Sequence, residues 1–184
     1  SVAMLLMAAM LFFMAGMYSK KERMTQIVTL ATPVNTTAYT LTKCAACVSA
    51  CVILCLVCAG VGMAYLGVIF GFYRVYDFIL PFALVVVPAV VFFAGLGLFA
   101  GRIRGGLVYA AMAVCLVFLL PMPQALDLYG TAYFSQYPIG LEAGASGEPD
   151  FAVTSAFLLG RILFIVLGLT LGAIGLIRKK PTVK

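Results

Sequence analysis

Five long apolar segments, separated by short stretches that carry most of the charge, constrain this chain more than any other feature of its sequence. They cover residues 1–19, 44–70, 78–100, 106–120 and 151–177. A helix needs roughly 20 apolar residues to cross the ~30 Å hydrocarbon core of a bilayer, and only the first and fourth segments lie near the lower limit. The pattern predicts an all-α integral membrane protein with five transmembrane helices in a single transmembrane domain.

Composition argues against a soluble fold. Charged residues make up 10% of the chain and apolar residues 65%, whereas roughly a quarter of the residues of a soluble domain are charged. The formal net charge is +6, but the basic residues lie between the apolar segments instead of forming a basic face, so we expect no nucleic-acid partner. The sequence has no histidine, the commonest metal ligand and general base. We predict neither a catalytic residue nor a metal site in this chain.

The charges also predict an orientation. Ten of the twelve Lys and Arg residues follow the first, third and fifth segments, and five of the six acidic residues lie in the other connections. Cytoplasmic loops of membrane proteins are enriched in Lys and Arg, so we expect these basic stretches and the carboxyl terminus in the cytoplasm. The first segment then starts on the outside without a basic flank. We therefore expect one more span before Ser1, and six spans in the full-length protein.

The two long connections carry further patterns. Residues 20–43, "KKERMTQIVTLATPVNTTAYTLTK", have apolar residues at helical spacing and a break at Thr32-Pro33. This amphipathic segment fits either an interfacial helix on the inner leaflet or a docking surface for a soluble partner. Residues 121–150 form an outer loop that mixes aromatic residues with Gly and Pro. There we expect one or two short helices at the outer leaflet.

Arg161 is the one ionisable residue that lies clearly inside an apolar segment. An intramembrane charge is costly, so the side chain needs a partner or a route to the interface. One interpretation is that it extends outward or caps the carbonyls of a broken helix. The other is that it lines a polar pathway and meets an acidic group of a substrate or of the outer loop.

Glycines in the apolar segments favour close helix packing. Gly168 and Gly172 form a GxxxG pair, which allows two helices to approach closely, either within the chain or between two copies. The stretch "GLGLFAG" at 95–101 is similar to a nucleotide-binding fingerprint, but it ends an apolar segment instead of joining a strand to a helix. Close helix approach is the better interpretation there too.

Five of the six cysteines lie in one stretch, "KCAACVSACVILCLVC". At ~100° per residue they fall within an arc of roughly 80° on a helix, so they form one stripe. Cys44 and Cys47 form a CxxC pair, but zinc normally takes four ligands, and the sequence has no second CxxC and no histidine to complete a site. Bridging geometry between neighbouring cysteines of a regular helix is poor. We interpret the stripe as a slim packing face, made of Cys44, Cys47, Cys51, Cys55 and Cys58.

The order of these parts resembles the membrane permease of ATP-binding-cassette transporters of the type-two, exporter-like class. The resemblance rests on Glu22 and Arg23 before the Thr32-Pro33 break, on Lys43 at the start of the next span, and on two later stretches. These are the outer loop "LPMPQALDLYGTAYFSQYP" and the last span with its basic tail, "GRILFIVLGLTLGAIGLIRKK". It covers nearly the whole chain, from the second span of the family onward.

The resemblance implies a half-transporter that pairs with a second permease copy or homologue in a membrane, with a bacterial cytoplasmic membrane as the expected location. A separate cytoplasmic ATPase would bind ATP and magnesium, and the permease itself would hydrolyse nothing. Membrane lipids would surround it. The resemblance does not identify the cargo, but the largely apolar spans favour an amphipathic or lipid-like one. The resemblance also implies an ATPase-coupling segment, with Lys20, Lys21, Glu22, Arg23, Met24, Ile27 and Val28.

A different class of protein fits the same packing motifs. A non-transporting scaffold or assembly subunit of a larger membrane complex would also need close glycine contacts and few polar residues inside its spans. An ion channel fits less well, because no ring of acids and no filter-like sequence lies in a span. Copurification of a soluble ATPase separates the permease from the scaffold.

Overall fold

The computed structural model describes residues 2–19, 24, 36–71, 76–117, 126–131 and 154–176, and no strand occurs among them. The described helices are α1 (Val2–Met17), α3 (Thr36–Phe70), α4 (Tyr76–Ile103), α5 (Leu107–Val117) and α7 (Ser155–Leu176). α1, α5 and α7 lie within the predicted segments 1–19, 106–120 and 151–177. α4 extends a few residues beyond 78–100 at both ends. α3 begins at Thr36, eight residues before the predicted segment 44–70, so residues 36–43 of the predicted amphipathic segment belong to this helix. The all-α class is therefore confirmed for the described part of the chain.

Three of these helices are long and apolar enough to cross a membrane. They contain the apolar stretches Thr37–Ile69, Ile79–Ile103 and Ser155–Leu176, of 33, 25 and 22 residues. The apolar parts of the other two, Leu5–Met17 and Leu107–Val117, are shorter. These are the same two segments whose sequences lie near the lower limit for a span. The described helices are compatible with a membrane protein.

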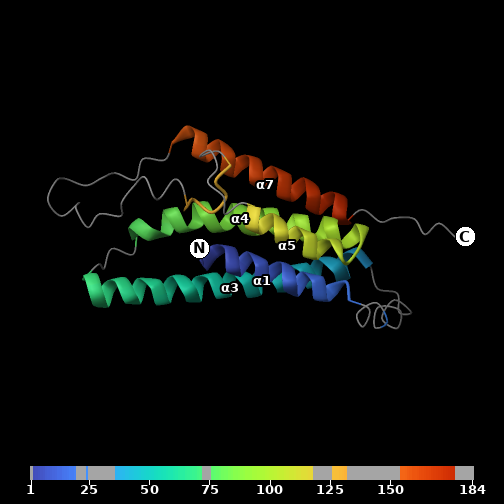
Figure 1. Cartoon of the computed structure of the whole chain (residues 1–184), viewed down its shortest axis with the longest axis horizontal. Helices are drawn as coiled ribbons and strands as arrows, with labels where there is room; N and C mark the ends of the chain where they lie inside the picture. The colour runs from blue at the N-terminus through green and yellow to red at the C-terminus, as the bar shows by residue number, and fades with distance from the viewer. Residues whose placement is uncertain are drawn as a thin grey trace, which may run out of the picture.

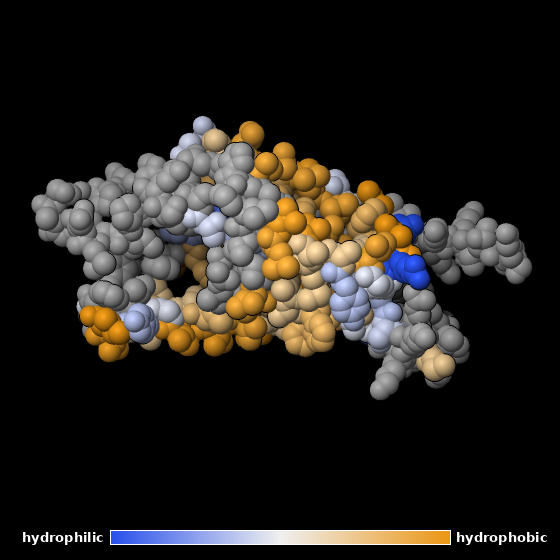
Figure 2. Space-filling view, in the orientation of Figure 1, coloured by the Kyte–Doolittle hydropathy of each residue, from blue (hydrophilic) through white to orange (hydrophobic). Residues whose placement is uncertain are grey.

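The outer surface of the helix bundle is strongly apolar. Figure 2 shows orange, hydrophobic side chains along much of the visible face. Large side chains such as Val68, which is 85% exposed, point away from the bundle on α3 and α7. A soluble protein rarely exposes so much contiguous apolar surface. Lipid is the solvent in which this surface carries no penalty.

The helices run side by side along the long axis of the molecule (Figure 1). α4 packs most extensively on α7, and α1 contacts α3, α4 and α5. The core lies where these helices meet, and its largest fully buried side chains include Phe93, Phe157, Met7, Met10 and Leu11. α1 therefore fills the centre of the bundle, while α4 and α7 form a closely packed pair on one side.

Candidate functional site

Arg161 is a buried cation in the first half of α7, with only 3% of its surface exposed. Its Nη1 donates a hydrogen bond to the backbone carbonyl of Leu128, and its Nη2 donates to that of Asp127 at 2.7 Å. The guanidinium also lies over the ring of Phe157, 4.1 Å from the ring centroid. These contacts attach the last helix to residues 126–131, here named the outer segment.

A tight turn presents the two carbonyls to the arginine. The Asp127 Oδ1 accepts hydrogen bonds from the Thr131 amide at 3.0 Å and from the Thr131 hydroxyl at 3.2 Å. The Gly130 amide donates to the Asp127 carbonyl at 3.1 Å, and Gly130 has a φ of 70°. Glycine adopts this left-handed conformation without a steric penalty, and a short Asp side chain stabilises turns of this kind. The local sequence "LDLYGT" thus encodes the turn.

Tyr129 connects the outer segment to α5 and α4. Its hydroxyl donates to the backbone carbonyl of Cys115 on α5 at 3.3 Å. Its ring stacks on Phe93 of α4, with centroids 6.4 Å apart and an interplanar angle of 16°. Burial raises the pKa of the Tyr129 phenol well above its usual value, and proximity to Cys115 adds to this shift. The outer segment therefore bridges α4, α5 and α7 through buried contacts.

One donor of the Arg161 guanidinium makes no hydrogen bond among the described residues. Within the described part of the chain, the buried Nε of Arg161 has no hydrogen-bond partner. Leaving a buried polar group unsatisfied costs about 1–3 kcal/mol. Asp127, buried like Arg161, provides an opposite charge that acts on the guanidinium. Arg161 is thus a buried cation that is held mainly by neutral carbonyls. Its Nε can still donate a hydrogen bond to one further acceptor.

The contacts of Arg161 combine features of the two interpretations drawn from the sequence. The arginine binds backbone carbonyls, as the capping interpretation expects, but these carbonyls belong to the outer connection. The sequence did not link Asp127 or Tyr129 to Arg161. Asp127 and Arg161 are 34 positions apart in the chain, so no local pattern connects them. The Asp and Gly of "LDLYGT" indicate a turn, but nothing in the sequence indicates what the turn faces.

Most of the predicted coupling segment lies outside the described residues. This applies to Lys20, Lys21, Glu22, Arg23, Ile27 and Val28. Met24 is described, and it is 74% exposed.

The cysteine stripe lies on α3 and faces α1. Cys44, Cys51 and Cys55 are buried, Cys47 and Cys58 are partly buried, and all are free thiols. The Cys51 Sγ lies 3.9 Å from the carbonyl of Leu6, and the Cys47 Sγ lies 3.8 Å from the sulfur of Met17. Among the described residues, no group of His, Cys, Asp or Glu could hold a metal ion. The stripe packs against a helix of its own chain.

Gly168 and Gly172 lie on α7 at its contact with α4, but they are not equivalent. A Cβ on Gly168 would lie 2.7 Å from the Cα of Phe92 and would also overlap the carbonyl of Val91. A Cβ on Gly95 of α4 would overlap the Gly168 carbonyl. A Cβ on Gly172 would lie 3.6 Å from the Gly95 Cα, an ordinary contact. The tightest crossing is therefore between Gly95 and Gly168, within the chain.

No protein-family model, no curated protein and no solved structure matches this chain. Among the described residues, Arg161 is the one cation buried in the apolar helix bundle, and a segment between α5 and α7 holds it. Such a residue is costly in a membrane helix, which makes Arg161 the candidate functional residue.

Proposed function

We propose that this protein is the membrane permease subunit of an ATP-driven exporter of the ATP-binding-cassette class, with five transmembrane helices in this chain and a cytoplasmic carboxyl terminus. The observation that supports it best is the burial of Arg161 against the outer segment. An apolar residue at this position would suit a bundle that only packs, because buried charges often cost more than well-packed apolar replacements. The arginine connects the last span to the connection near which cargo would leave.

The contacts of Arg161 suit a site that changes partners. Neutral carbonyls hold the guanidinium, and its Nε has no partner in the described structure. An anionic group of an amphipathic cargo would bind the guanidinium more strongly than a carbonyl does. Cargo would then favour a conformation in which the outer segment is released, and alternating access follows from such differential binding.

The free energy for transport would come from a separate cytoplasmic ATPase. The coupling segment would dock this ATPase, as the family resemblance implies. Copurification tests this role: replacing Glu22, Arg23 and Met24 together should release the ATPase. As a matched control, Val68→Ala alters a more exposed apolar side chain near the other end of α3 and should leave the complex intact. A complex that forms unchanged after the triple replacement would refute the coupling assignment.

Substrate-stimulated ATP hydrolysis by the purified complex tests transport itself. A panel of lipids, peptides, glycans and hydrophobic drugs should identify one class that stimulates hydrolysis. Arg161→Gln should reduce that stimulation by about tenfold or more, because a charge-assisted contact contributes roughly 1.5–3 kcal/mol. Equal stimulation in both proteins would remove Arg161 from the pathway.

A scaffold subunit is the second candidate. The backbone contact between Gly95 and Gly168 favours it, because a crossing this close suits a rigid assembly. A scaffold would copurify with other membrane proteins and with no ATPase. Its Arg161 variants would then change which membrane proteins copurify with it.

A further inference from the structure

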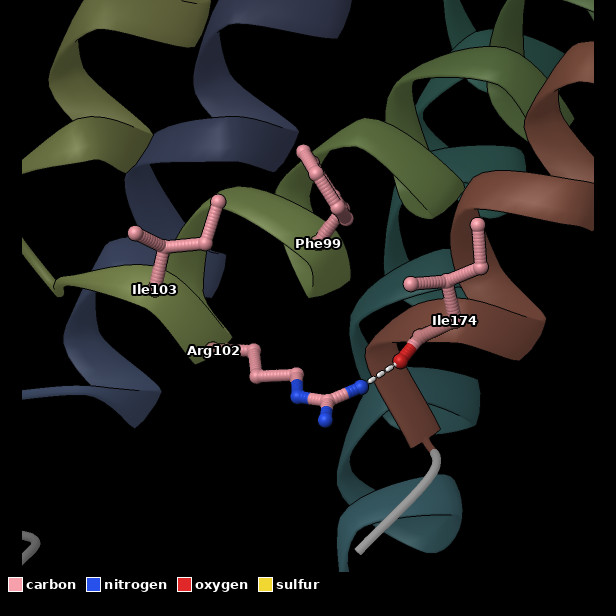
Figure 3. A pocket seen from close by; sticks show the side chains of 4 residues that line it. All are labelled: Phe99, Arg102, Ile103 and Ile174. Carbon is pink, nitrogen blue, oxygen red and sulfur yellow. Dashed lines mark hydrogen bonds between the residues drawn. The ribbon is translucent and has the colours of Figure 1, made fainter. Parts of the chain in front are cut away.

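A pocket of about 230 Å³ lies between the last turns of α4 and α7 (Figure 3). Phe99, Arg102 and Ile103 line it from α4, and Ile174 lines it from α7. It lies at the opposite end of α7 from the Arg161 centre, so it is separate from the site described above. Three of its four lining residues are apolar.

The guanidinium of Arg102 reaches across the pocket. One of its terminal nitrogens donates a hydrogen bond to the backbone carbonyl of Ile174. Carbonyls in the last turn of a helix lack helical partners, and a cation there is favoured by the helix dipole. The other terminal nitrogen points away from both helices (Figure 3). The arginine is thus fixed by one bond and presents a second donor outward.

The surroundings of the pocket are basic and apolar at once. Arg104, two residues beyond Arg102, is exposed, and the sequence has no Asp or Glu from 78 to 126 or from 151 to 184. The sequence continues after α7 with Arg178, Lys179 and Lys180, which lie outside the described residues. Of the apolar lining, Ile103 is 59% exposed and Ile174 46%. A ligand that fits must carry negative charge next to an apolar body.

We propose that this pocket binds the headgroup of an anionic glycerophospholipid. The headgroup phosphate would accept hydrogen bonds from Arg102, and an acyl chain would lie along Ile103 and Ile174. Basic pockets between membrane helices bind anionic headgroups in this way. A membrane lipid fits better than free phosphate, because the pocket has apolar walls and opens beside the apolar surface of the bundle. This site does not depend on whether the protein transports anything.

Native mass spectrometry of the purified protein tests the site. The protein is equilibrated with mixed micelles of phosphatidylglycerol and phosphatidylcholine in equal amounts, and the bound lipids are counted. We expect phosphatidylglycerol to be retained roughly fivefold over phosphatidylcholine, the factor for one arginine near an anionic headgroup. Arg102→Gln should abolish that preference. Arg104→Gln is the matched control, because Arg104 does not line the pocket, and it should keep most of the preference.

A second variant keeps the test decisive if Arg102→Gln fails to fold. Ile174→Trp fills the pocket without removing a charge, and it should lower phosphatidylglycerol retention to the level of phosphatidylcholine. Retention that is equal for the two lipids in the wild-type protein would overturn the proposal, and so would retention unchanged by both pocket variants. Displacement of the lipid by inorganic phosphate alone would identify a free-phosphate site and would also contradict it.

Discussion

The Arg161 guanidinium donates a 2.7 Å hydrogen bond to the backbone carbonyl of Asp127, which lies 34 positions earlier in the chain. The other terminal nitrogen of the guanidinium donates a second hydrogen bond, to the Leu128 carbonyl. α7 and the outer segment are therefore fixed to each other by a buried charge. The other buried side chains of the described residues, Asp127 apart, are apolar. The first prediction follows from this arrangement.

Arg161→Met should loosen the outer segment. Methionine replaces the arginine with an unbranched apolar side chain, so it preserves much of the packing. It leaves the carbonyls of Asp127 and Leu128 without their donor. An unsatisfied buried group costs about 1–3 kcal/mol, so amide exchange of residues 126–131 should accelerate by roughly tenfold or more. Hydrogen-exchange mass spectrometry measures this rate.

Thr170→Ala is the matched control on the same helix. Thr170 is exposed, and its hydroxyl bonds only the carbonyl of Leu167 in its own helix among the described contacts. Exchange in the outer segment should not change in this variant. If Arg161→Met also leaves exchange unchanged, the arginine does not hold the segment.

Gly168→Ala should destabilise the bundle, whereas Gly172→Ala should be tolerated. The new methyl group at 168 would overlap the backbone of Val91 and Phe92, and backbone cannot move aside cheaply. Overpacking of this kind typically costs about 1–3 kcal/mol. At 172 the methyl group would make an ordinary contact, 3.6 Å from the Gly95 Cα. Thermal unfolding in detergent micelles, followed by circular dichroism, compares the variants, and equal melting temperatures would contradict the tight crossing.

Cys55→Leu should also destabilise the protein, because Cys55 is buried where α3 packs in the core. We expect a loss of about 1–3 kcal/mol from overpacking. Val57→Leu, on the exposed side of the same helix, is the control and should have little effect. The same unfolding assay distinguishes the two variants.

Chelators and reducing agents should leave the stability of the wild-type protein unchanged. All the cysteines are free, and the described residues include no group that could hold a metal. Elemental analysis after purification provides the check. Stoichiometric metal retained by the protein would show that the cysteine stripe is a ligand set and not a packing face.

Tyr129→Phe should cost about 0.5–1.5 kcal/mol at neutral pH, through the lost hydrogen bond to Cys115. The stacking on Phe93 is preserved by the substitution. Burial raises the pKa of Tyr129 in the folded state, so its stabilising effect is fully present below the unfolded pKa of about 10 and declines as the pH rises above that value. The stability difference between the two proteins should therefore shrink above about pH 10. A difference that is constant from neutral pH to pH 11 would contradict burial of the phenol.

Much of the helical architecture was predictable, because apolar length and charge are properties of each segment alone. Three of the predicted segments, 44–70, 78–100 and 151–177, overlap the described helices that are long and apolar enough to span a membrane, although α3 begins eight residues before its segment. The Gly168 and Gly172 pattern predicted a close helix contact, and both glycines lie against α4, but the pattern could not rank them. Their ranking depends on which residues of α4 lie opposite, and no local pattern encodes that.

The sequence by itself determined that this chain is helical and apolar, and that one cation lies within its last apolar segment. It determined these properties because helix formation and lipid compatibility depend on residues close together in the chain. Only the tertiary structure decided that Arg161 meets the outer segment, that the cysteine stripe faces α1, and that Gly95 opposes Gly168. These contacts join residues far apart in the chain, and they form because packing brings the helices together in one specific arrangement.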